Sequence, residues 1–284
     1  MSTTCATLVA GCRELEFNYA AATTATGNAE AEWGDYAGQL QSVTFTAFDA
    51  AGVKRTPVVA QYLYDASGHL RTVWDPRISP ALKTKYDYDA AGHVTVVTPP
   101  GELPRTITYA ALPGESNTGR LQNVSRPALP SGTAVDTVTY RVPLSGTANG
   151  MTAPYPMAAS DTDAWAQDDK PVDATALFPP DQVPADPLAP ASFTRASVDY
   201  VDSNGRLVNS AKAGGAIDVT EYDNFGNVIR ELTPTNRACA IDDSCTVASG
   251  LDPTDHPTKA DDLDSHSIYS VDGVDLLERR SGYQ

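Results

Sequence analysis

The 284 residues of this chain, with a mass of 30.0 kDa, are enough for one large β unit or two modest domains. Its 20 basic and 36 acidic residues give a net charge of −16, which repels nucleic-acid phosphates and anionic membranes and so excludes nucleic acid as a partner. No apolar run is long enough to cross a bilayer, which excludes membrane insertion.

Short strands are predicted near the start of the chain. Residues 14–19, Glu-Leu-Glu-Phe-Asn-Tyr, alternate polar and apolar side chains, as a half-buried strand does. A second strand is predicted from Val43 to Phe48, and a turn follows it at once. Residues 61–110 and 119–144 continue the same pattern of alternating strands and turns, with proline-rich turns predicted at residues 74–77 and 98–101.

The turns share a tetrad of an aspartate, two free residues and a glycine, with an aromatic residue one or two places before it. The turn residues are Asp49 and Gly52, Asp65 and Gly68, Asp89 and Gly92, Asp202 and Gly205, and Asp223 and Gly226. Aspartate suits the first position of a type I turn, where its carboxylate accepts a hydrogen bond from the backbone two residues on. Glycine suits the fourth position, where the backbone often needs a positive φ. The tetrads therefore predict a row of β-hairpins.

A second rule applies after Gly68, Gly92, Gly205 and Gly226 of the tetrads, and after Gly38 and Gly119: one polar residue, then one apolar residue. Examples are Gly68-His69-Leu70 and Gly205-Arg206-Leu207. We expect the polar side chain to face solvent and the apolar one to face the packed side of the sheet.

The chain is expected to divide into three parts. Residues 1–144 form a first hairpin segment, and residues 145–196, rich in proline, alanine and aspartate, form an insertion or crossover without strands. Residues 197–284 form a second hairpin segment that contains an acidic loop at 238–265 and a degenerate repeat from Tyr269 to Gly273. Helix is expected only at 161–167 and 258–264, for a turn or two. Trp165, Tyr155 and Phe178 indicate that the insertion packs against something.

The four cysteines form two local pairs, Cys5 with Cys12 and Cys239 with Cys245. Such pairs fit small disulfide loops in an exported protein, although free thiols are the alternative. Their spacing differs from that of common zinc sites.

No catalytic motif, metal site or cofactor site is predicted, so the expectation is a non-enzyme without a cofactor. His69 and His93 occupy the solvent-facing position after a turn glycine. The aspartates of the 238–265 loop offer oxygen ligands for calcium but follow no known calcium-loop spacing, which favours a solvated loop.

The segments Tyr64–Leu70, Tyr88–Val94 and Tyr222–Val228 follow the pattern Tyr-Asp-x-x-Gly-x-apolar. This pattern resembles the YD-repeat (Rhs-repeat) family, and residues 74–84 are similar to large actinobacterial wall-associated members. The resemblance implies an all-β fold, in which consecutive antiparallel hairpins form a curved, spiralling sheet. It also implies a secreted or cell-wall-associated bacterial protein, in which this chain is a strip of a shell.

The leading hypothesis is therefore a non-catalytic structural segment of an exported shell that encloses or presents a toxin or effector domain. Its partners would be other repeats of the same, longer polypeptide. The alternative is a cell-surface adhesion module that binds carbohydrate or protein, for which Trp33, Trp74 and Trp165 would be the stacking residues. A hydrolase is a remote alternative.

Overall fold

The computed structural model of the chain describes residues 8–116, 119–247 and 251–282. It confirms the all-β class, because consecutive strands pair antiparallel as hairpins and the few helices are short. The chain divides into two compact units: unit 1 is Met1–Thr108 with Val124–Thr133, and unit 2 is Tyr109–Asn123 with Ala134–Gln284.

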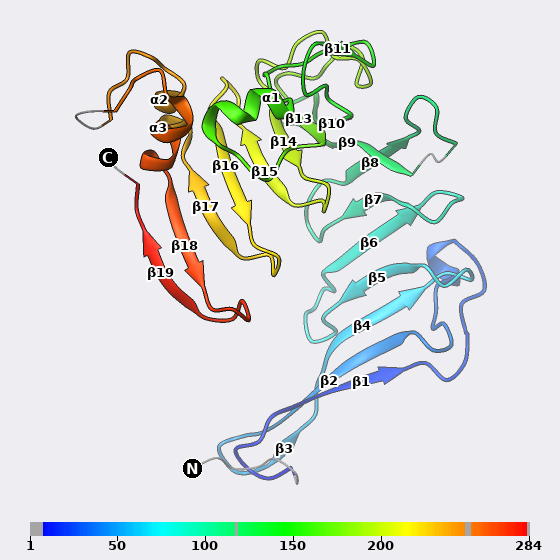
Figure 1. The fold of residues 1–284 in the computed structure, drawn as a ribbon. Helices are drawn as coiled ribbons and strands as arrows, with labels where there is room; N and C mark the ends of the chain where they lie inside the picture. The colour runs from blue at the N-terminus through cyan, green and yellow to red at the C-terminus, as the bar shows by residue number, and fades with distance from the viewer. Residues whose placement is uncertain (1–7, 117–118, 248–250, 283–284) are drawn as a thin grey trace. The chain divides into compact units, whose positions relative to one another are not determined.

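Unit 1 is a sheet in which β1, β2, β4, β5, β6, β7 and β8 pair in that order (Figure 1). Its strands are β1 (Glu14–Tyr19), β2 (Leu40–Phe48), β3 (Lys54–Arg55), β4 (Val58–Tyr64), β5 (Leu70–Trp74), β6 (Lys83–Tyr88) and β7 (Val94–Thr98), and its 3-10 helix is η1 (Glu30–Glu32). Three strands contain residues of both units: β8 (Arg105–Ala110), β9 (Arg120–Pro127) and β10 (Thr133–Tyr140).

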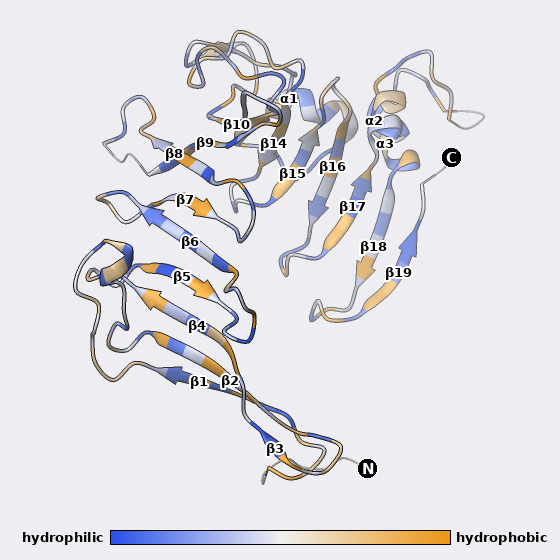
Figure 2. Cartoon of the chain, turned by 180° about the vertical axis from the view of Figure 1, so that it is seen from behind, coloured by the Kyte–Doolittle hydropathy of each residue, from blue (hydrophilic) through white to orange (hydrophobic). Residues whose placement is uncertain are grey.

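The two faces of the first strand pair in unit 1, β1 with β2, differ in polarity. Phe17 lies opposite Val43 on one face, and Glu16 lies opposite Thr44 on the other. Hydrophobic and hydrophilic residues accordingly alternate along the middle of β2, whereas the pattern is less regular along β4 and β5 (Figure 2). The residues of the hydrophobic core cluster belong to unit 2, and none comes from the described part of unit 1.

Unit 2 combines a sheet with short helices. The pairing order is β10, β13, β14, β15, β16, β17, β18 and β19. The strands after β10 are β11 (Thr147–Ala148), β12 (Met151–Thr152), β13 (Asp173–Phe178), β14 (Ser197–Val201), β15 (Leu207–Ala211), β16 (Ile217–Tyr222), β17 (Val228–Leu232), β18 (Ser265–Tyr269) and β19 (Leu276–Arg280). The helices are α1 (Ala159–Thr162), η2 (Asp163–Trp165), α2 (Pro234–Ala240) and α3 (His256–Leu263).

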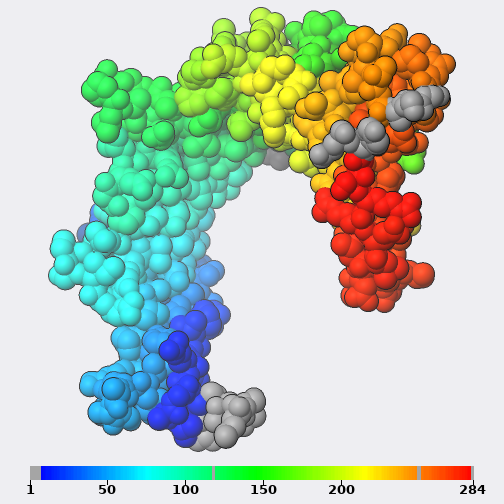
Figure 3. Space-filling view, turned by 90° about the vertical axis from the view of Figure 1, so that its left-hand side faces the viewer, coloured from blue at the N-terminus to red at the C-terminus, as the bar shows by residue number. Residues whose placement is uncertain are grey.

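The core of unit 2 lies between this sheet and the helices. Phe178, Val198 and Val219 come from alternating strand positions, and Trp165 comes from η2; each is at most 2% exposed. The helix α2 contacts α3 and β16, and α3 contacts η2. The hairpin β18–β19, red in Figure 3, extends from the body of unit 2.

Several elements differ from the expectations. The strands β11, β12 and β13 lie inside the proline-rich segment 145–196, where we expected none; Ala174, Ala176 and Phe178 are the buried alternating residues of β13, and alanines give a weak strand signal. The helices α2 and η1 lie outside the two stretches where helix was expected, and α2 extends into the predicted loop 238–265. The start of α2 had a local signal, because Thr233 caps the helix and Pro234 follows as its first residue.

Among the described residues, no helix is long and apolar enough to cross a membrane.

Candidate functional site

The five turn aspartates share one hydrogen-bonding geometry. In each tetrad, Oδ1 of the aspartate accepts hydrogen bonds from the backbone N–H groups two and four residues on, at 2.8–3.0 Å. The backbone carbonyl of the aspartate accepts a hydrogen bond from the glycine N–H at 2.9–3.1 Å. Each glycine has a φ between 76° and 87°, which only glycine adopts without strain. One side chain thus ties together a five-residue turn.

In four of the five tetrads the second carboxylate oxygen of the aspartate binds the side chain that follows the glycine, whereas at Asp49 it binds Arg55. Oδ2 of Asp202 accepts a hydrogen bond from Arg206 Nε at 2.8 Å, and Oδ2 of Asp223 accepts one from Asn227 Nδ2 at 2.9 Å. His69 Nδ1 lies 3.3 Å from Asp65 Oδ2 in the same arrangement. The residue after the glycine therefore folds back onto its turn, where we had expected it to point to solvent.

A tyrosine directly before the aspartate joins neighbouring hairpins. The hydroxyl of Tyr88 donates a hydrogen bond to the backbone carbonyl of Leu70 at 2.8 Å, and that of Tyr222 donates one to Leu207 at 2.9 Å. Tyr64 makes the equivalent bond to the carbonyl of Leu40 at 2.7 Å. Each acceptor is the apolar residue that follows a Gly-x pair in the preceding part of the array. We call this bond the tyrosine interlock.

Side-chain stacking strengthens two of the three interlocks. The His69 ring stacks on Tyr88 with centroids 4.7 Å apart, and the Arg206 guanidinium lies 5.0 Å from the centre of the Tyr222 ring. His69 and Arg206, each the residue after a turn glycine, thus contact both their own aspartate and the tyrosine of the next hairpin.

The hydrogen bonds of the turns also affect ionisation. The hydrogen bond from the backbone N–H of Val53 is the main cause that lowers the pKa of Asp49 below its ordinary value. The backbone N–H of His93 lowers the pKa of Asp89 in the same way. Burial works in the opposite direction at Asp202, but hydrogen bonds from Arg206 and Asn204 still hold the pKa of that carboxyl below its usual range.

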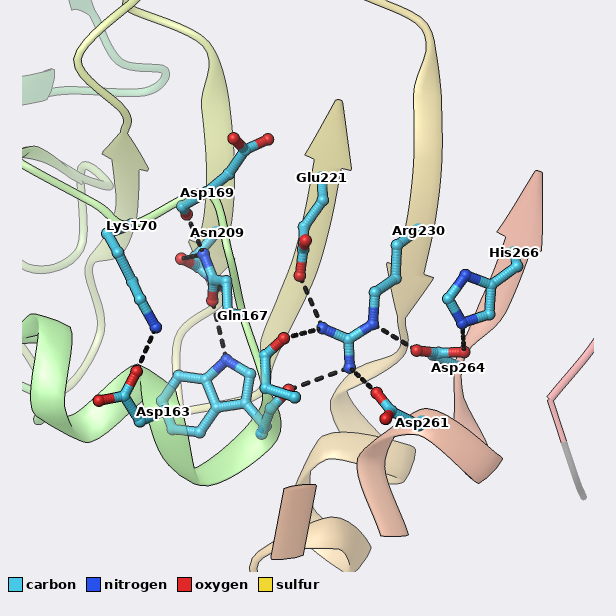
Figure 4. Close-up of polar contacts among 12 residues, drawn as sticks. Asp163, Gln167, Asp169, Lys170, Asn209, Glu221, Arg230, Asp261, Asp264 and His266 are labelled. Carbon is cyan, nitrogen blue, oxygen red and sulfur yellow. Dashed lines mark hydrogen bonds and ion pairs between the residues drawn. The ribbon is translucent and has the colours of Figure 1, made fainter. Parts of the chain in front are cut away.

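A buried ionic cluster in unit 2 was not predicted (Figure 4). Arg230 of β17 is 5% exposed and donates to Glu221 Oε1 of β16 at 2.6 Å. It also binds the carboxylate of Asp264, which follows α3, and donates to the backbone carbonyls of Ala166 at 2.7 Å and Trp165 at 3.0 Å. This arginine therefore joins two strands, the end of α3 and the end of η2.

The same cluster extends to β18. His266 Nε2 lies 2.8 Å from Asp264 Oδ1, and Glu221, Arg230 and His266 lie side by side on three neighbouring strands. Burial raises the pKa of both Glu221 and Asp264, against the opposing effect of Arg230. The sequence carried one signal for this cluster. Glu221 lies two residues from the core residue Val219, and Arg230 lies two residues from Leu232, so both charged side chains fall on the buried face of the sheet.

The acidic region 238–265 is structured by local bonds. Cys239 and Cys245 form a disulfide with an S–S distance of 2.01 Å, whereas Cys5, and with it the Cys5–Cys12 pairing, lies outside the described residues. Lys259 is 1% exposed and donates through Nζ to the backbone carbonyls of Asp242 and Pro253. In the described part of the chain, no group of three or more His, Cys, Asp or Glu side chains is arranged to hold a metal ion.

The three tryptophans are engaged by other side chains. The Arg71 guanidinium lies 5.1 Å from the centre of the Trp33 ring, and Lys83 Nζ lies 4.7 Å from that of Trp74. Trp165 is 2% exposed and packs in the core of unit 2 against Arg237.

Comparison with protein families gives a match of residues 64–102 to the RHS Repeat family. The matched range contains the tetrads of Asp65 and Asp89 and the interlock of Tyr88 with Leu70. No curated protein matches the chain.

Among solved structures, the chain is similar to a crystal structure of TcdB2-TccC3 without its hypervariable C-terminal region. The identity is 16% and the TM-score 0.29, over 69% of this chain and 11% of the other. It is also similar to the Photorhabdus luminescens Tc holotoxin pore, at 13% identity and a TM-score of 0.30, over 85% of this chain and 13% of that one. The chain thus spans only a small part of the length of either protein.

Proposed function

We propose that this chain is a non-catalytic wall segment of a larger hairpin-repeat protein. The tyrosine interlock is the observation that carries this proposal. It recurs at Tyr64, Tyr88 and Tyr222, and each time it connects adjacent hairpins of the array. The motif residues therefore extend and stiffen a sheet, and the RHS Repeat match at 64–102 supports the same role.

The free sheet edges support a role as part of a longer array. In the described structure β1 pairs only with β2, and β19 pairs only with β18. Both strands carry exposed apolar side chains, among them Phe17 at 54% and Leu277 at 65%. Unpaired edges with apolar side chains favour strand addition, which further repeats of the same polypeptide would supply.

The wall, on this proposal, belongs to an exported bacterial protein and encloses or presents a toxin or effector domain. The alternative role, a surface module that binds carbohydrate or protein, has less support. Trp165 is buried, and one face of the Trp33 ring and of the Trp74 ring is already occupied by Arg71 and Lys83, respectively, which leaves less ring surface for sugar stacking.

The proposal is tested by measuring the mass of the purified chain in solution as its concentration rises. We expect association through the free edges, and we expect Phe17→Lys together with Leu277→Lys to suppress it, because edge lysines oppose strand addition. Leu129→Lys is the matched control, since Leu129 is 86% exposed but lies outside both edge strands. A monomer at all concentrations with a sharp two-state unfolding transition would contradict the proposal.

A further inference from the structure

A groove in unit 2 lies beside the ionic cluster, between β17 and β18. Its volume is about 460 Å³, and residues of both strands line it together with residues of the segment after η2. The two strands pair only through Arg230 with His266 and Glu231 with Ser265. At the turn end, Asn227 Nδ2 donates to the Gly273 carbonyl at 2.8 Å. The groove thus lies between strands that are joined at both ends and left open in the middle.

The open stretch coincides with a missing tyrosine interlock. Tyr269 begins the degenerate repeat, and by the rule of the other hairpins its acceptor would be the carbonyl of Val228, which follows Gly226 and Asn227. Within the described residues the Tyr269 hydroxyl makes no hydrogen bond, and Tyr269 lines the groove with Ile229 and Ile268 instead. The backbone and side chains that would close this seam are therefore available to another molecule.

The lining has apolar walls and an acidic rim. Ala166, Ile229 and Ile268 supply the apolar surface. The carboxylates at the groove are those of Asp168, Glu221, Asp223 and Asp261, and the basic side chains that line it are those of Arg230 and His266.

Two of these carboxylates are exposed and can accept a further partner. Asp168 makes no side-chain hydrogen bond or ion pair within the described structure, and Asp261, whose side chain is 61% exposed, forms an ion pair with Arg230 at 3.6 Å. A lysine or arginine side chain matches this arrangement, because its methylene groups pack on apolar walls while its charged head reaches carboxylates.

We propose that this groove binds an extended peptide segment that presents lysine or arginine side chains. The groove lies within the size range of ligand sites, about 300–1,000 Å³. The proposal goes beyond the wall function and does not depend on it, because every residue that it uses lies in unit 2.

The test uses a fluorescent pentapeptide with two arginines between alanines and measures its anisotropy with the full chain. We expect saturable binding that weakens as the salt concentration rises, and no binding of the twin peptide with glutamates in place of the arginines. Asp168→Asn and Asp261→Asn, measured separately, should each weaken binding about tenfold. Asp136→Asn removes the same charge from an exposed position of β10 outside the groove and should change the affinity less than about twofold.

Three outcomes would overturn the proposal: equal binding of both peptides, absence of saturable binding, or equal weakening by Asp136→Asn. The last would show general attraction to a chain of net charge −16. Unfolding midpoints of the variants show whether each remains folded, and Asp261→Asn, at an exposed position, keeps the test valid if Asp168→Asn is unstable.

Discussion

At the scale of single residues, the aspartate and the tyrosine of the repeat motif each make their own hydrogen bonds. The aspartate closes the turn through Oδ1 and holds the residue after the glycine through Oδ2. The tyrosine reaches a backbone carbonyl of the neighbouring hairpin. A substitution at one position should therefore remove one defined interaction and leave the others in place.

Tyr88→Phe tests the interlock, because it removes the hydroxyl and keeps the ring that stacks on His69. We expect a loss of about 0.5–1.5 kcal/mol in the free energy of unfolding, the usual contribution of one hydrogen bond. Tyr86→Phe is the matched control in the same strand, since the Tyr86 hydroxyl makes no hydrogen bond within the described residues. Equal effects of the two substitutions in urea denaturation would contradict the interlock.

Asp89→Asn tests the charge of a turn carboxylate while keeping an acceptor for the N–H groups of Ala91 and His93. The pKa of Asp89 is lowered in the folded chain, so its ionisation stabilises the fold above the unfolded pKa of about 3.9, and this contribution is lost as the pH falls through the folded pKa. We expect wild type to lose stability relative to Asp89→Asn below about pH 4, and urea denaturation of both across this range measures it. A difference that does not change with pH would contradict this account.

At the scale of elements, the buried ionic cluster around Arg230 joins β17 to β18, where the strands are not connected by a short hairpin and few backbone pairs form. The segment 233–264 leaves β17, forms α2 and α3, and returns as β18. Only two residue pairs join β17 to β18 in the described structure. The ion pairs of Asp264 with Arg230 and with His266 therefore contribute much of the interaction that holds the two strands together.

Arg230→Met should therefore destabilise unit 2 strongly, by about 3–5 kcal/mol, because it leaves Glu221 buried without a counterion and removes the arginine partner of the buried Asp264. Arg195→Met breaks an exposed ion pair with Asp181 and should cost about 0–1 kcal/mol. Thermal and urea denaturation measure the free energy of unfolding of both variants. Equal decreases would show that the buried cluster stabilises unit 2 no more than an exposed ion pair does.

The same variant has a pH signature. The pKa values of Glu221 and Asp264 are already raised by burial, and loss of Arg230 raises them further. A raised carboxyl pKa contributes stability that is present below the unfolded pKa and lost as the pH rises through the folded pKa. The difference between wild type and Arg230→Met should consequently shrink as the pH falls from neutral towards about 4.

At the scale of the whole molecule, the two units are stabilised differently. Unit 2 buries a cluster that includes Met157, Trp165 and Phe178 between strands and helices. The described part of unit 1 contributes nothing to that cluster, and its strands are mostly half-exposed. Unit 1 therefore depends more on its turns, interlocks and strand pairing.

Hydrogen exchange should show this difference. We expect amides of β14–β16 to exchange at least about tenfold more slowly than those of β4–β6, because opening of a strand packed on a buried core costs more free energy. Mass spectrometry of peptic fragments measures both regions in one sample. Equal protection would indicate that the whole chain opens as one cooperative unit.

The hairpins are encoded locally, because the aspartate, the glycine and the N–H groups that they organise lie within five residues of one another. These contacts need no partner from elsewhere in the chain, and the turn preferences of aspartate and glycine favour them, so the pattern alone predicts the turn. The same local logic failed for β13, whose alanines resemble those of a loop, and for the side chains after the glycines, whose second contact lies on the next hairpin. The tyrosine interlocks, the buried ionic cluster around Arg230 and the groove beside it depend on tertiary structure. The residues that form them are up to 65 positions apart in the chain, and only the pairing of strands and the return of the chain through α3 bring them together.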